Sequence, residues 1–171
     1  PATLDPNLEQ EIISINDQVI AGFGVKNGMT HAEFYLTQNG PVFGEMAVRP
    51  PGGYYMELIE YAYGFNPWQT YVELETGATP EPLPVKAKKY ACVLMIHPEA
   101  GIVEEISGLE HLESLKEVEI FTFKVEPGSV VSERDSTSSE VGHVLMSADS
   151  RETLLASLKT IEDSLVIKMK R

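Results

Sequence analysis

The stretch THAEFYLTQNGPVFGEMAVRPPGG, residues 30–53, carries most of the information in this sequence of 171 residues. Two β-prone segments, Thr30–Thr37 and Pro41–Val48, surround Gln38-Asn39-Gly40, a combination typical of a β-hairpin. The prolines and glycines that follow, at 49–53, do not favour a strand, because proline lacks an N–H donor and glycine has no side chain to pack. The sequence therefore predicts a hairpin followed by a loop.

The turn determines whether Glu33 and Glu45 share one face of this hairpin. A two-residue turn at Asn39-Gly40 would place Glu33 opposite Met46 and leave Glu45 on the other face. A three-residue loop, with Gly40 as a bulge, places Glu33 directly across from Glu45. We favour the second register because it also gathers apolar residues of both strands on the opposite face. These residues are Ala32, Phe34, Leu36, Val42, Gly44 and Met46.

Two carboxylates that face each other across neighbouring strands repel, and a hard divalent cation offsets that repulsion. Magnesium typically takes one or two carboxylates from a protein and completes its octahedron with phosphate oxygens and water. Solvated surface glutamates on an acidic protein are an equally good interpretation of the spacing alone.

The hairpin sequence resembles the metal-binding hairpin of the ATP-grasp superfamily of ligases, and its Arg-Pro-Pro-Gly-Gly ending is most similar to the L-amino-acid ligase branch. The resemblance implies that Glu33 and Glu45 hold Mg²⁺ or Mn²⁺ on ATP. Ala47 stands where the family usually has asparagine. An alanine cannot supply the third metal ligand that the family has at this position. The helix order around the hairpin and the β-rich remainder of the chain also follow the family.

The resemblance further implies roles for the residues beside the metal pair. Arg49 would be the catalytic and substrate-binding cation, because a guanidinium clamps a carboxylate or an acyl-phosphate with two parallel hydrogen bonds. Gly52 and Gly53 would offer backbone N–H groups to an anion. His31 is a further candidate for substrate binding, although we favour a packing role for it unless the nucleotide reaches this position.

The amino-terminal half predicts three helices. Asp5-Pro6 supplies a cap and a proline at the first helical position of a helix over 6–21, and Asn66-Pro67 does the same for one over 67–76. A helix over 54–63 lies between the loop and Asn66. Three prolines at 79–84 indicate a linker.

The carboxyl-terminal half predicts short strands over 88–96, 101–106, 118–125, 141–147 and 166–169. One helix is expected over 150–163, with Asp149 as its cap and Glu152 completing a capping box. The expected class is therefore α+β: the carboxyl-terminal part of an ATP-grasp fold over 1–78, a linker over 79–87, and a small β-rich domain with one helix over 88–171.

Composition narrows the range of partners. The formal net charge of −13 disfavours nucleic acid, and the apolar runs are too short to span a bilayer, so we expect a cytoplasmic protein. The lone Cys92 lies in an apolar run and suits a core position. The histidines at 97, 111 and 143 are not spaced as metal ligands are, and we predict them at the surface or in turns.

The combined prediction is a carboxyl-terminal fragment of an ATP-dependent carboxylate–amine ligase that acts through an acyl-phosphate. The lysines with which the family holds ATP would lie in an earlier part of the same protein, so we expect the fragment alone to be inactive; a homodimer is also possible. One alternative is a purine-biosynthesis or biotin-carboxylase-like ATP-grasp enzyme. A second is a non-catalytic binding or assembly module in which both glutamates are ordinary surface residues.

Overall fold

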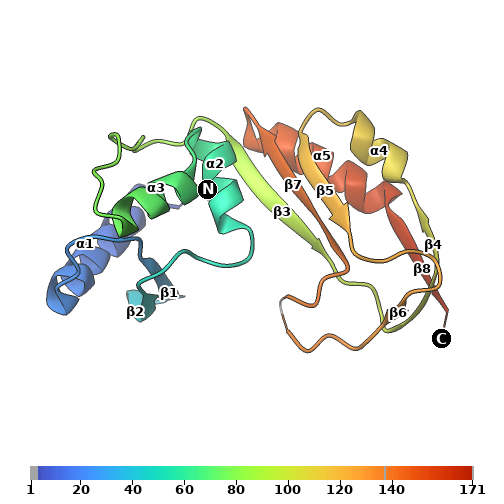
Figure 1. Cartoon of the computed structure of the whole chain (residues 1–171), viewed down its shortest axis with the longest axis horizontal. Coiled ribbons are helices and arrows are strands. Elements are labelled where there is room, and N and C mark those ends of the chain that lie inside the picture. Colours follow the sequence, from blue (N-terminus) through green and yellow to red (C-terminus); the bar gives the residue numbers. More distant parts are fainter. Residues whose placement is uncertain (1–3, 137, 171) are drawn as a thin grey trace. The chain divides into compact units, whose positions relative to one another are not determined.

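The computed structural model describes residues 4–136 and 138–170, which divide into two compact units (Figure 1). The first unit comprises the described residues up to Gly52 together with Asn66–Leu83. The second comprises Gly53–Phe65 together with the described residues from Pro84 onward. The chain therefore passes from one unit to the other between Gly52 and Gly53.

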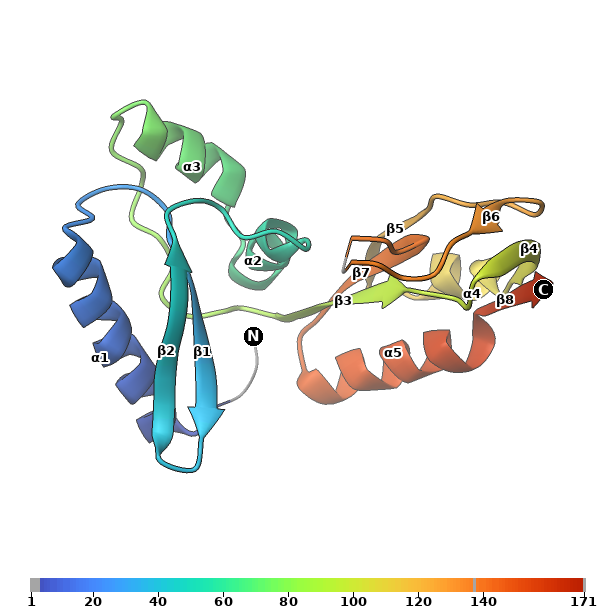
Figure 2. The ribbon, with the colours of Figure 1, turned by 90° about the horizontal axis from the view of Figure 1, so that it is seen from below.

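The first unit holds two helices and the hairpin. They are α1 (Pro6–Phe23), β1 (His31–Thr37), β2 (Gly40–Ala47) and α3 (Pro67–Glu75). An Asp5 carboxylate oxygen accepts the Asn7 N–H at 2.9 Å, and Gly24 ends α1 with a φ of 68°, as cap and glycine predict. The helix packs along β2 (Figure 2).

The second unit contains two antiparallel three-stranded sheets, ordered β3-β7-β5 and β6-β4-β8. Its elements are α2 (Tyr55–Tyr63), β3 (Tyr90–Ile96), β4 (Gly101–Ser107), α4 (Leu109–Ser114), β5 (Val118–Phe123), β6 (Val130–Val131), β7 (Gly142–Ala148), α5 (Arg151–Ser164) and β8 (Val166–Lys170). The α+β class is confirmed.

Strand β7 is the centre of the second unit, because β3 and β5 pair with it on either side and all seven of its residues are buried. Val144 and Met146 point to the face that α4 and α5 cover, where they meet Leu112 and Ile161 in one apolar core. Side chains alternate along a strand, so His143 points to the opposite face, where α2 packs against β3 and β7.

The structure of the second unit differs from three of the expectations drawn from the sequence. Helix α5 is capped by Ser150, whose Oγ accepts the Thr153 N–H at 3.1 Å, and not by Asp149. A second helix, α4, accompanies α5; its six residues are too few for a helical period to be visible in the sequence. Residues 53–65, expected with the first unit, group with the second because α2 packs on β3 and β7.

We predict that Ile161→Ala destabilises the second unit by about 2–5 kcal/mol, because a fully buried aliphatic side chain is replaced by a cavity. Leu155→Ala on the exposed side of α5, where Leu155 is 43% exposed, is the matched control and should cost less than about 1 kcal/mol. Urea unfolding monitored by circular dichroism measures both. Equal losses for the two variants would contradict the placement of the core.

Candidate functional site

The hairpin brings Glu33 and Glu45 face to face, as the favoured register predicted, because the two residues are direct cross-strand partners. The route to this pairing differs from the expected one. From Thr37↔Gly40 to Phe34↔Phe43 the strands pair in one register, and the register shifts between Phe34 and Glu33. The extra residue on β2 is Gly44, so the shift that aligns the carboxylates lies at Gly44 and not in the turn.

Glycine suits this bulge for a steric reason. A Cβ atom on Gly44 would lie 2.8 Å from the Tyr35 ring and 3.2 Å from the Glu33 carbonyl oxygen. A side chain would therefore push against both neighbours at the point where the register changes. The apolar face of the hairpin carries the expected Ala32–Met46 pair, whereas Phe34 meets Phe43, their rings 5.8 Å apart, where Gly44 was expected.

The surroundings of the glutamate pair are open. Glu33 has a side chain that is 58% exposed, and His31 Nε2 lies 3.9 Å from its Oε1. Within residues 4–136 and 138–170, no group of three or more His, Cys, Asp or Glu side chains could hold a metal ion. Two carboxylates fit Mg²⁺ when phosphate oxygens and water supply the other ligands, so the donor set suits a metal carried on a nucleotide.

The loop after β2 contains the remaining predicted site residues. Arg49 is exposed, and its Nη1 donates to the carbonyl oxygen of Pro50 at 2.8 Å, so the guanidinium turns onto its own loop. A Cβ on Gly52 would meet open space. Gly53 has a φ of 66°, a conformation that glycine adopts without strain.

A polar network that the sequence analysis missed lies immediately after this loop. The Tyr54 hydroxyl donates to Glu140 Oε1 at 2.9 Å, and Lys124 Nζ donates to the same oxygen. The Tyr54 ring also stacks on His143, with centroids 4.1 Å apart. His143, expected at the surface or in a turn, is only 8% exposed because it belongs to the central strand β7. In the sequence, the feature that could have indicated this network is the position of Tyr54 directly after Gly52-Gly53.

The network shifts the pKa values of Glu140, Tyr54 and His143. The hydrogen bond from Lys124, helped by that from Tyr54, lowers the pKa of Glu140 to about 2, although burial opposes the shift. Burial and the bond to Glu140 raise the pKa of Tyr54 to about 12. Burial lowers the pKa of His143, so the stacked imidazole is neutral near pH 7.

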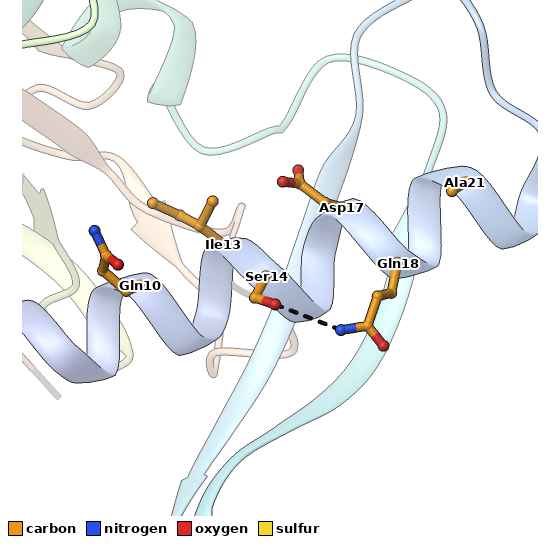
Figure 3. A pocket seen from close by; sticks show the side chains of 6 residues that line it. All are labelled: Gln10, Ile13, Ser14, Asp17, Gln18 and Ala21. Carbon is orange, nitrogen blue, oxygen red and sulfur yellow. Dashed lines mark hydrogen bonds between the residues drawn. The ribbon is translucent and has the colours of Figure 1, made fainter.

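A pocket on the surface of α1 is a second candidate site (Figure 3). Its lining residues all belong to α1: Gln10, Ile13, Ser14, Asp17, Gln18 and Ala21. Gln18 Nε2 donates to Ser14 Oγ at 3.4 Å. Among residues 4–136 and 138–170, no second element contributes to this pocket and none of the predicted site residues lines it, so the hairpin is the better candidate.

We predict that Glu140 contributes to acid sensitivity. Because its pKa lies below the unfolded value of 4.5, its ion pair stabilises the fold fully above pH 4.5 and is lost as the pH falls toward 2. Glu140→Gln should therefore lower the urea midpoint at pH 7, and its midpoint should approach that of the wild type in acid. Glu113→Gln, which changes an exposed charge, is the control. Parallel pH curves for wild type and Glu140→Gln would contradict this assignment.

Of the helices in the described part of the chain, none combines the length and apolar character that membrane crossing requires.

Part of the chain is similar in sequence to L-amino acid ligases. Residues 93–170 match the family model for L-amino acid ligase C-terminal domain 2. A curated relative, the L-arginine-specific L-amino acid ligase of Bacillus subtilis, is 23% identical over 135 residues, which make up 78% of this chain and 33% of that protein. The chain thus spans about a third of the length of this relative.

Solved structures agree on the fold. The L-amino acid ligase from Bacillus licheniformis superposes with a TM-score of 0.82 and 21% identity, over 100% of this chain and 43% of that one. Phosphoribosylglycinamide synthetase from Anaerococcus prevotii gives a TM-score of 0.80 and 16% identity, over 99% of this chain and 44% of that one. The chain therefore has the fold of the carboxyl-terminal portion of ATP-grasp ligases, and its residues 93–170 match the carboxyl-terminal domain of L-amino acid ligases.

Proposed function

We propose that this chain is the carboxyl-terminal part of an ATP-dependent carboxylate–amine ligase that joins amino acids. In this reaction the γ-phosphoryl group of ATP is transferred to a substrate carboxylate, which gives an acyl-phosphate and ADP. The amine of the second substrate then attacks the acyl carbon, and the amide forms as inorganic phosphate and a proton leave.

The pairing of Glu33 with Glu45 is the observation that carries this proposal. The two carboxylates share one exposed face of the hairpin, where their mutual repulsion makes a divalent cation a stabilising partner. Bound Mg²⁺ or Mn²⁺ would neutralise charge on the ATP phosphates. The role of the two glutamates is to hold and orient that metal–nucleotide complex.

The neighbouring loop supplies the groups for the acidic substrate. Arg49 is exposed and donates to the Pro50 carbonyl oxygen within its own loop, so its guanidinium can turn to a substrate carboxylate or an acyl-phosphate. The backbone N–H groups of Gly52 and Gly53 would complete the anion site. His31, close to Glu33, would line the same face of the hairpin.

An amino-acid ligase is favoured over other members of the superfamily by the match of residues 93–170 and by the named relative from Bacillus subtilis. A purine-biosynthesis enzyme is the runner-up, because phosphoribosylglycinamide synthetase is nearly as similar in structure, with a TM-score of 0.80. Phosphate release by the full-length protein, measured with a panel of amino acids and with glycine plus phosphoribosylamine, distinguishes the two. A cytoplasmic location and a homodimer stay predictions from the sequence.

We predict that Glu45→Gln in the full-length protein lowers kcat/KM for amide formation by about 10²-fold or more, because one charged metal ligand is lost. Glu9→Gln in the first turn of α1 makes the same change of charge at an exposed position and serves as the control. Product formation is measured by chromatography at saturating Mg²⁺. An unimpaired Glu45→Gln enzyme would favour the non-catalytic module and end the metal assignment.

We also predict that residues 1–171 alone bind Mg²⁺–ATP only weakly. The hairpin offers two carboxylates, and the triphosphate must be held by groups elsewhere before the shared metal adds affinity. Calorimetric titration of this chain should show no tight site, whereas the full-length protein should bind. Tight, stoichiometric binding by the chain alone would show that the nucleotide site is complete within these residues.

A further inference from the structure

We propose that Tyr54 is a positioning residue of the ligase: its hydroxyl, held by Glu140, fixes the backbone of Gly53 in the conformation that offers an anion-binding N–H group. This inference rests on the proposed function, in which Gly53 contacts the substrate. It gives a role to the polar network around Tyr54 and Glu140, which does not include Glu33 or Glu45.

The backbone of Tyr54 is the first reason. Tyr54 has a φ of 69° and is the only non-glycine residue with positive φ in residues 4–136 and 138–170. A side chain with a Cβ disfavours this conformation, so neighbouring contacts must hold it. Gly53 precedes it with a φ of 66°, which makes two consecutive left-handed residues at the end of the loop.

The position of Tyr54 in α2 is the second reason. It is the N-cap of α2, where Ser, Thr, Asp or Asn would stabilise the helix, and its side chain makes no capping hydrogen bond. The helix therefore gains no side-chain cap from tyrosine at this position. Tyrosine is long enough for its hydroxyl to donate to Glu140 Oε1 at 2.9 Å, and Glu140 lies 86 residues further along the chain.

The anchor itself is rigid and buried. The Glu140 side chain is 3% exposed and also receives the Lys124 ammonium, so its oxygen has a fixed position. The His143 ring packs against the Tyr54 ring, with 4.1 Å between the ring centroids. The Nδ1 atom of His143 is buried without a hydrogen-bond partner in the described structure. Hydroxyl and ring together hold Tyr54 in its strained conformation and thereby restrict Gly53.

The test uses the full-length protein with Tyr54→Phe, which removes only the hydroxyl, and Tyr63→Phe at the other end of α2 as the matched control. Glu140→Gln, which keeps an oxygen acceptor, is compared with Glu140→Ala, which removes it. Each variant is measured for thermal stability, for kcat and KM with the amino-acid substrate, and for amide hydrogen exchange at Leu58, whose N–H donates to the Tyr54 carbonyl oxygen at 3.0 Å.

Tyr54→Phe should raise KM about tenfold while kcat changes less than about threefold, the size expected for a lost hydrogen bond to a charged group that acts on substrate binding. Amide exchange at Leu58, whose N–H donates to the Tyr54 carbonyl oxygen, should accelerate by about tenfold while β7 stays protected. Glu140→Gln should retain more substrate affinity than Glu140→Ala. Tyr63→Phe should behave as the wild type.

A KM for Tyr54→Phe within about twofold of the wild type would overturn the proposal, as would equal effects of Tyr54→Phe and Tyr63→Phe. If the wild-type protein joins no amino acids, the proposed function fails, and the exchange measurement then decides only whether the Tyr54 hydroxyl anchors the backbone at this position. Faster exchange at Leu58 in Tyr54→Phe would support that anchoring. Unchanged exchange would refute it, and with it the restriction of Gly53.

Discussion

The bulge at Gly44 is the constraint on which the proposed chemistry depends. If the register that begins at Thr37↔Gly40 continued along the hairpin, Glu33 would lie opposite Gly44, and Glu45 would project from the other face. One extra residue on β2 reverses that arrangement and places both carboxylates on one side. The close approach of the Tyr35 ring and the Glu33 carbonyl to Gly44 allows no side chain there without displacement.

The second unit is organised around a different constraint, the complete burial of β7. In a strand buried on both faces, every polar side chain is removed from water, and a polar atom without a hydrogen-bond partner there costs free energy. Val144 and Met146 fill the face below α4 and α5, whereas His143 lies against the Tyr54 ring on the other face. Glu140, just before the strand, is compensated by Lys124 and Tyr54, so a buried charge is held by partners from two distant segments.

Local signals in the sequence predicted most helices and strands. Asp5-Pro6 and Asn66-Pro67 begin α1 and α3 as expected, because capping needs only neighbouring residues. The hairpin was predictable for the same reason. The position of its bulge was not, since the turn and Gly44 give the same pairing of Glu33 with Glu45 and differ only in the pairs nearer the turn. The Tyr54–Glu140 bond joins residues too far apart in the chain for any local pattern to reveal.

The openness of the glutamate pair is consistent with a site shared between this chain and a nucleotide. A resident metal centre surrounds its ion with protein ligands, and an ion held by only two carboxylates of the described chain retains most of its water. On the proposed function, the coordination positions that protein ligands leave to water would be filled by phosphate oxygens of ATP. The affinity for the metal would then depend on ATP. The net charge of −13 acts in the same direction, since an acidic surface repels free nucleotide unless a cation accompanies it. On the proposed function, the hairpin would therefore favour the metal complex of ATP over ATP itself.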